Sequence, residues 1–104
     1  MIIQFNTDNN IKGTEAVREP LIAMIAEGLK RHSAQITRIE VYLTDQNGKK
    51  SGENDKRCVL EARLAGMQPV SVSNDADTRD QAVEGAIDKL NSSLETILNR
   101  NKGY

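Results

Sequence analysis

The residue types that most often carry catalysis are scarce in this sequence. It contains one histidine, His32, and one cysteine, Cys58. His32 stands beside Arg31 at the expected end of a helix, where an exposed histidine commonly complements the helix dipole. Cys58 alternates with polar residues on the apolar side of a predicted strand, which indicates a buried structural thiol. Neither residue has the partners of a nucleophile–base pair, so the sequence predicts a protein that is not an enzyme.

The sequence also lacks the patterns of a metal or cofactor site. A zinc site needs about four Cys, His or acidic ligands at suitable spacing, and the chain does not offer them. The acidic residues Asp75, Asp77 and Asp80 do not follow the pattern of a calcium-binding loop. No Gly-rich phosphate loop joins a strand to a helix. We therefore expect no metal, no cofactor and no small-molecule substrate.

Length and composition limit the remaining classes. At 104 residues the chain has room for one domain, which we place at residues 1–104. One cysteine cannot form an internal disulfide, so the fold does not need an oxidising compartment. No apolar run is long enough for a membrane span, and the N-terminus does not resemble a secretion signal. We expect a cytoplasmic protein without membrane contact.

Four runs of alternating apolar and polar residues predict four short strands. The runs cover residues 2–6, 38–44, 58–64 and 70–73. The polar segments 45–56 and 74–77 are predicted to be loops. Each strand would turn one apolar face to a core and one polar face to solvent.

Two segments show the periodicity of amphipathic helices. The first places apolar residues on one face at Val17, Leu21, Met24, Ile25, Gly28 and Leu29. Pro20 leaves two alternatives, a start at Glu19 or a kinked helix that starts at a Thr14 cap. We favour the kinked helix because Val17 keeps the apolar period before the proline.

The second helix follows a capping box formed by Thr78 and Gln81. Its apolar face is formed by Val83, Ala86, Ile87, Leu90, Leu94 and Ile97. The element order is therefore β-α-β-β-β-α, an α+β fold. The simplest packing is one four-stranded sheet with both helices on one face, where Leu64 and Leu90 are buried.

The charges are almost balanced, so nucleic-acid binding would have to depend on local patches. There are 14 Lys and Arg against 15 Asp and Glu, a net charge of −1. The topology brings the ends of both helices and the start of the second strand to one pole. The basic residues expected there are Lys30, Arg31, His32, Arg38, Arg100 and Lys102. They either complement the helix dipoles or form a patch for RNA phosphates.

A second basic group lies in the predicted loop and its borders. It consists of Lys49, Lys50, Lys56 and Arg57. The same loop also contains the acids Glu53 and Asp55. The loop is either simply solvated or a second RNA contact. On the open sheet face, Arg38 and Arg63 are expected to pair with Glu40 and Glu61 across strands.

The element order and several short strings resemble the ribosome hibernation-promoting factor family, also called ribosome-associated inhibitors or sigma modulation proteins. The strings are TEAVRE at residues 14–19 and a stretch at 76–90 that ends in AIDKL. The strand pairing across residues 38–72 also fits in length. The resemblance covers nearly the whole chain and implies a fold similar to a double-stranded-RNA-binding domain.

The resemblance also implies a function and a site. Members bind 16S rRNA in the decoding cleft of the small ribosomal subunit and inhibit translation during stress or stationary phase, mostly through contacts of Lys and Arg with phosphates. The RNA-binding residues would be Lys30, Arg31, Arg38, Lys89 and Arg100, with secondary contacts from Lys49, Lys50, Lys56 and Arg57.

The sequence departs from the family pattern in its charges. The middle of helix one reads Met24-Ile25-Ala26-Glu27 where members usually carry bases, and Asn91-Ser92-Ser93 follows Lys89-Leu90. Between residues 76 and 100 there are five acids and three bases. The alternative function is therefore a protein-interaction module on the same fold, with weak or no RNA binding.

Overall fold

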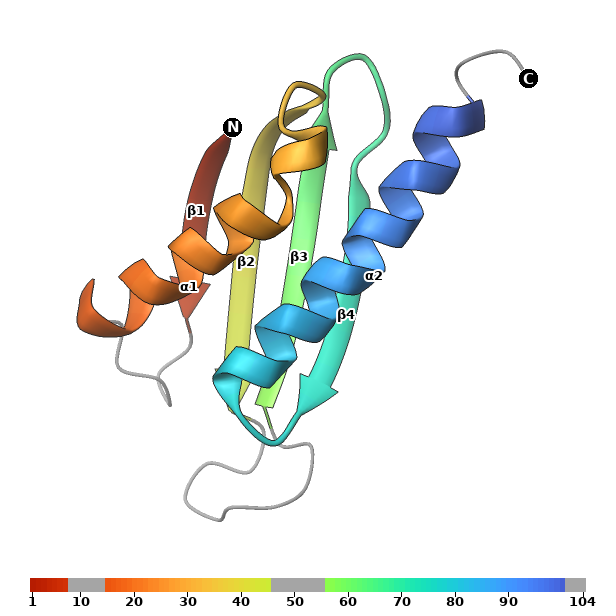
Figure 1. The fold of residues 1–104 in the computed structure, drawn as a ribbon. Coiled ribbons are helices and arrows are strands. Elements are labelled where there is room, and N and C mark those ends of the chain that lie inside the picture. Colours follow the sequence, from red (N-terminus) through yellow and green to blue (C-terminus); the bar gives the residue numbers. More distant parts are fainter. Residues whose placement is uncertain (8–14, 46–55, 101–104) are drawn as a thin grey trace.

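The computed structural model describes residues 1–7, 15–45 and 56–100, without the side chains of residues 7, 15–17, 45 and 100. Seven elements follow one another along the chain (Figure 1). They are β1 (Ile2–Thr7), α1 (Glu15–Gly28), the short 3-10 helix η1 (Lys30–His32), β2 (Ile36–Asp45), β3 (Lys56–Leu64), β4 (Val70–Ala76) and α2 (Arg79–Arg100). Apart from η1, this is the predicted order.

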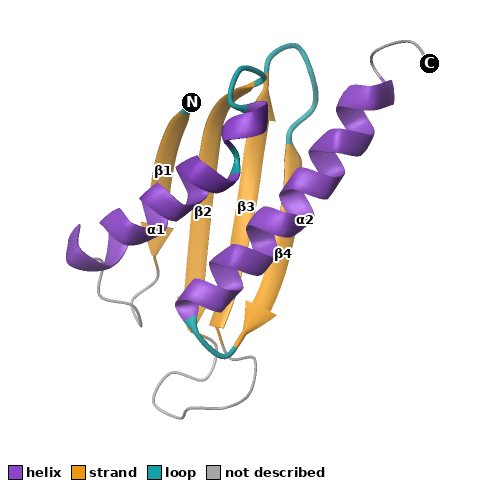
Figure 2. Ribbon diagram, in the orientation of Figure 1, coloured by secondary structure: helices purple, strands orange, loops and turns teal. Residues whose placement is uncertain are grey.

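The four strands form one mixed sheet in the order β1-β2-β3-β4. β1 runs parallel to β2, while β2–β3 and β3–β4 are antiparallel. Both helices cover the same face of this sheet, and the other face is open (Figure 2). This arrangement confirms the predicted α+β fold. It forms because one layer of helices can bury the single apolar face that each strand presents.

The core lies between the sheet and the helices. Alternate residues of β3, namely Cys58, Leu60 and Ala62, have no exposed surface. The apolar face of α2 packs on them, and Leu90 is completely buried. Leu64 is 6% exposed, so the predicted burial of both leucines is confirmed.

The two helices approach closely at Gly28. A side chain there would collide with Ile87, since a Cβ atom on Gly28 would lie 2.7 Å from Ile87 Cγ2. The amide of Asn91 donates a 2.9 Å hydrogen bond to the Gly28 carbonyl at the end of α1. This bond satisfies one of the carbonyls that a helix end leaves without an intrahelical partner.

The structure bears on the predicted boundaries of both helices. α1 continues through Pro20, as the favoured alternative required, whereas the Thr14 cap lies outside the described residues. At α2, the Thr78 hydroxyl accepts a 3.1 Å hydrogen bond from the Gln81 amide. That bond is half of the predicted capping box.

The prediction of a loop at residues 74–77 is wrong, because β4 extends to Ala76. Asn74 lies opposite the buried Cys58 and faces the helices. Its Nδ2 atom lies 3.4 Å from the Gln81 carbonyl oxygen and 3.3 Å from that of Ala82. The polar Asn74 side chain can therefore face the helices because it hydrogen-bonds to the first turn of α2. Apolar–polar alternation in the sequence does not predict such a position.

The interpretation of His32 as an exposed helix-end residue is also wrong. The residue is 9% exposed, and its Nε2 atom has no hydrogen-bond partner among the described residues. The tight 3-10 turn after Leu29 explains this position. It exposes Lys30 and Arg31 while the next side chain turns inward.

Candidate nucleic-acid interface

The predicted pole exists. α1 ends, η1 follows and β2 begins at the same end of the molecule at which α2 ends (Figure 1). Lys30 and Arg31 lie there with side chains 68% and 63% exposed. The parallel β1–β2 pair requires this arrangement, because α1 has to return the chain to the start of β2.

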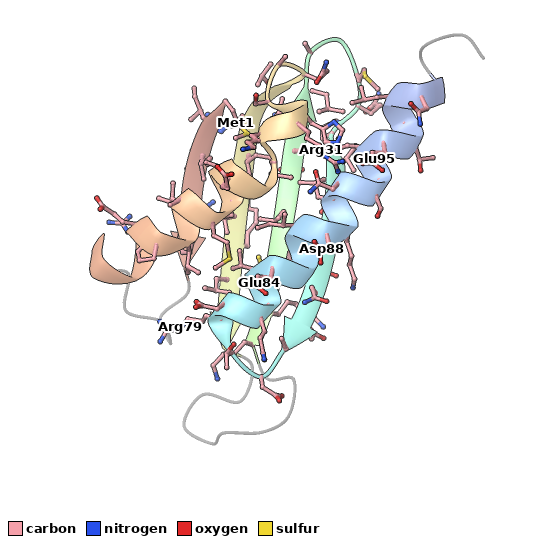
Figure 3. All side chains as sticks on the ribbon, in the orientation of Figure 1. Met1, Arg31, Arg79, Glu84, Asp88 and Glu95 are labelled. Carbon is pink, nitrogen blue, oxygen red and sulfur yellow. The ribbon has the colours of Figure 1, made fainter. Side chains whose placement is uncertain are left out.

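Each of these two cations already has an acidic partner. Lys30 Nζ lies 2.9 Å from Glu27 Oε1, and this hydrogen bond, with the charge of Glu27, raises the pKa of Lys30. Arg31 Nη2 lies 2.6 Å from Glu95 Oε1 on α2 (Figure 3). Such exposed pairs contribute little to stability. A phosphate can therefore replace the carboxylates at low cost.

Arg38 lies on the opposite side of the sheet from these cations. It alternates with the buried Ile39 and so belongs to the open face. Its Nε atom lies 3.8 Å from Glu40 Oε2. The sheet therefore separates Arg38 from the helix side of the pole.

The open face carries ion pairs of the predicted residues, but only the Arg63–Glu40 contact crosses between strands as predicted. Arg63 Nη2 lies 3.7 Å from Glu40 Oε2 on the neighbouring strand and 3.9 Å from Glu61 Oε1 on its own strand. Tyr42 donates a 3.1 Å hydrogen bond to Glu40, and this bond is the main cause of its raised pKa. The open face is thus a charge-compensated surface.

Lys89 lies in the middle of α2, away from η1. Its Nζ atom donates a 2.9 Å hydrogen bond to the carbonyl of Ser73 on β4. A shallow groove surrounds this contact and was not predicted from the sequence. The groove encloses about 500 Å³ and is lined by Val72, Ser73, Asp88, Lys89, Ser92 and Ser93. No sequence pattern indicates it, since it joins residues of β4 to residues of α2 that are 15 or more positions away.

The remaining predicted contacts are only partly described. Lys49, Lys50 and the side chain of Arg100 lie outside the described residues. Lys56 begins β3. Arg57 forms a two-pronged contact with Asp75 on β4, with Nε–Oδ1 and Nη2–Oδ2 distances of 2.7 and 3.2 Å. This contact raises the pKa of Arg57 and lowers that of Asp75.

The described residues offer little for other chemistry. Burial raises the pKa of the Cys58 thiol to about 12, which suppresses the nucleophilic thiolate. Within the described ranges, no three His, Cys, Asp or Glu side chains are arranged to hold a metal ion. None of the helices in those ranges is both long and apolar enough to cross a membrane.

Comparison with known proteins identifies the family. Residues 3–102 match the model of the sigma 54 modulation protein / S30EA ribosomal protein family. The chain belongs to this family. The match covers the strings at 14–19 and 76–90, and it confirms the resemblance found in the sequence. No curated protein matches the chain.

Two solved structures share the fold of this member of the sigma 54 modulation protein / S30EA ribosomal protein family. The N-terminal domain of Protein Y from Thermus thermophilus has 21% identity and a TM-score of 0.73, and the alignment covers 93% of this chain and 99% of that one. A ribosomal subunit interface protein from Coxiella burnetii has 19% identity and a TM-score of 0.73, with 95% and 99% covered. At these identities the likeness concerns the fold.

The helix side of this family member is not uniformly basic. Glu84, Asp88 and Glu95 follow one another along the outer side of α2, between Arg79 at its start and Arg31 at the pole (Figure 3). The outer side of α2 therefore carries mainly negative charge, while η1 carries two exposed cations.

Proposed function

We propose that this protein binds 16S rRNA in the decoding cleft of the small ribosomal subunit and inhibits translation during stress or stationary phase. It would do so in the cytoplasm, as one non-catalytic domain. The family match over residues 3–102 supports the proposal more than any other observation. A bound domain in that cleft would exclude messenger and transfer RNA.

Lys30 and Arg31 are the proposed primary phosphate contacts. They are exposed, they sit together on η1, and their carboxylate partners are exchangeable. Lys89 adds a contact from α2 if phosphate replaces the Ser73 carbonyl as its acceptor. Arg38 would contribute only where RNA extends around the pole to the open face, and Arg100 stays a proposed contact at the end of α2.

A paired charge reversal tests the site. We expect Lys30→Glu with Lys89→Glu to weaken co-sedimentation with purified small subunits at low salt, because two phosphate contacts become repulsive. The matched control is Arg18→Glu with Arg79→Glu. It makes the same change in net charge in the first turns of α1 and α2, where acids suit the helix dipoles.

The outcomes separate specific from general attraction. Wild type and the control pair should bind alike, and circular dichroism should show all three proteins folded. Equal binding by the Lys30/Lys89 variant, or no binding by wild type at low salt, would exclude this site.

A second candidate function is supported by the acids on α2. A protein-interaction module with weak or no RNA binding would use the same fold, and Glu84, Asp88 and Glu95 favour it. This function predicts that the wild-type protein does not bind purified small subunits from which other associated proteins have been removed. The co-sedimentation experiment therefore distinguishes the two.

A further inference from the structure

β4 is an edge strand with a free backbone side. In the part of the chain that the structure describes, β3 is its one neighbour. An antiparallel edge strand turns the N–H and C=O groups of every other residue away from the sheet. The bond from Lys89 to the Ser73 carbonyl marks Ser73 as one of these residues. Ser71 and Asp75 share its orientation by alternation.

The groove between β4 and α2 follows this edge. Val72 forms apolar floor in it, and the side chains of Asp88, Lys89, Ser92 and Ser93 form its helix wall. Val70 and Val72 remain half-buried, although their neighbours Ala62 and Leu60 on β3 are completely buried. Apolar surface, free backbone groups and a helix wall thus lie side by side.

We propose that this groove binds an extended segment of a partner protein, which adds a fifth strand to β4 and carries an acidic side chain for Lys89. This binding mode uses backbone hydrogen bonds for affinity and side-chain contacts for specificity. The proposal does not depend on ribosome binding.

Charge complementarity with Lys89 explains why the partner segment should carry an acidic residue. An incoming backbone N–H would take the Ser73 carbonyl and displace Lys89 Nζ, which is now 2.9 Å from it. The released ammonium needs an acceptor on the helix side of the new strand, and a carboxylate is the strongest one available. One carboxylate is enough to pair with Lys89. Asp88 also lines the groove, so several acids in the segment would be repelled by its charge.

Backbone geometry determines the rest of the segment. The residue directly opposite Ser73 would share its side of the sheet, which is the open face, so its two neighbours would face α2. Those neighbours would lie opposite Val72 and Asn74. Together with the next residue that faces α2, opposite Val70, they would be the acid and the small apolar residues that contact the two valines. RNA supplies neither a row of backbone N–H groups nor aliphatic side chains for these valines.

A blocked peptide of sequence Thr-Val-Thr-Glu-Thr-Val-Thr is the probe. Added in millimolar excess to the full-length ¹⁵N-labelled protein, it should shift the backbone amides of Ser71, Val72, Ser73 and residues 88–93. Methylation of the backbone nitrogens of the two threonines beside the glutamate should remove these shifts. Failure of the unmodified peptide to shift them, or shifts confined to α1, η1 or β1, would overturn the proposal.

Two further comparisons test the role of Lys89. A probe with glutamine in place of glutamate should bind about two- to fivefold more weakly, as expected for one exposed ion pair. In Lys89→Ala protein this preference should vanish while the peptide still binds. A preference that persists would show that the carboxylate does not meet Lys89.

Other occupants of the groove are outcomes of the same design. If a single-stranded oligouridine shifts these amides and the peptide does not, the groove is an RNA site and the proposal fails. If the amides shift on raising protein concentration alone, with a doubled mass in sedimentation, a second copy occupies the edge and the proposal also fails.

Discussion

Cys58 shows how one position in the fold determines the chemistry of a side chain. It is completely buried under the helices, and its pKa of about 12 leaves almost no thiolate near neutral pH. We expect no reaction of native protein with iodoacetamide at mildly alkaline pH, and full reaction in denaturant. Rapid alkylation of the native state would show that the strand opens locally.

The functional prediction for His32 and Cys58 is that neither takes part in binding. Both face the core, so Cys58→Ala and His32→Ala should retain small-subunit binding as long as each variant is folded. Co-sedimentation after a circular dichroism check measures this. Loss of binding in a stably folded His32→Ala protein would contradict it.

Leu90 belongs to the completely buried face of α2. Leu90→Ala should lower the free energy of unfolding by about 2–5 kcal/mol, because it removes apolar contacts and leaves a cavity. Chemical denaturation measures the loss. The half-buried Ile97, truncated in the same way, should cost less, and a Leu90 loss below about 1 kcal/mol would contradict this packing.

At the scale of elements, the sequence predicted type and order but not every boundary. Alternation and helical periodicity are direct consequences of one buried face per element, so four strands and two helices were predictable. The end of β4 was not, because Asn74 bonds the first turn of α2 instead of entering a loop. The inward turn of His32 likewise depends on η1, which has no periodic signal.

Gly85 is the helix partner of that strand end. A Cβ atom at Gly85 would lie 2.1 Å from Asn74 Nδ2. Gly85→Ala should therefore lower the free energy of unfolding by about 1–3 kcal/mol, because Asn74 loses its acceptors and is displaced. Denaturation of the single variant measures this.

The double variant supplies the control for Gly85. In an Asn74→Ala background the collision is absent, and alanine is the better helix former by about 1 kcal/mol. Gly85→Ala should then be neutral or stabilising. Equal destabilisation in both backgrounds would mean that Asn74 is not what requires glycine.

The Arg57–Asp75 pair links β3 to β4 and makes their pairing sensitive to acid. Its hydrogen bond lowers the pKa of Asp75 below the ordinary 3.8. The unfolded chain therefore binds the proton more readily, so the pair stabilises the fold above that value. This contribution is lost as pH falls through the lower folded pKa. In wild type, the urea concentration at the unfolding midpoint should fall as the pH is lowered. We expect this fall to be smaller in Asp75→Asn and in Arg57→Gln. An unchanged fall in both variants would contradict the linkage.

At the scale of the whole molecule, the sequence predicted that Lys30 and Arg31 lie at one pole but not how these two cations are engaged. The crossover from β1 to β2 and the direction of α2 follow from element order, and they place Lys30 and Arg31 at one pole. The Glu27–Lys30 pair has the i,i+3 spacing that a sequence can show, whereas the Arg31–Glu95 pair joins η1 to α2 and could not be assigned from spacing. Arg38 lies near the start of β2 on the open face, as strand alternation predicted, so the sheet separates it from these two cations.

The salt dependence of ribosome binding reports how many of these cations act together. Each phosphate contact releases counterions, and the slope of affinity against salt counts the contacts. With acids along α2 and cations at η1, wild type should show a shallow slope, equivalent to roughly three to five phosphates. Lys30→Glu with Lys89→Glu should flatten it further, while Arg18→Glu with Arg79→Glu should leave it unchanged. Co-sedimentation at several salt concentrations gives the three slopes. If both pairs flatten the slope equally, the attraction follows net charge and the pole is not the binding surface.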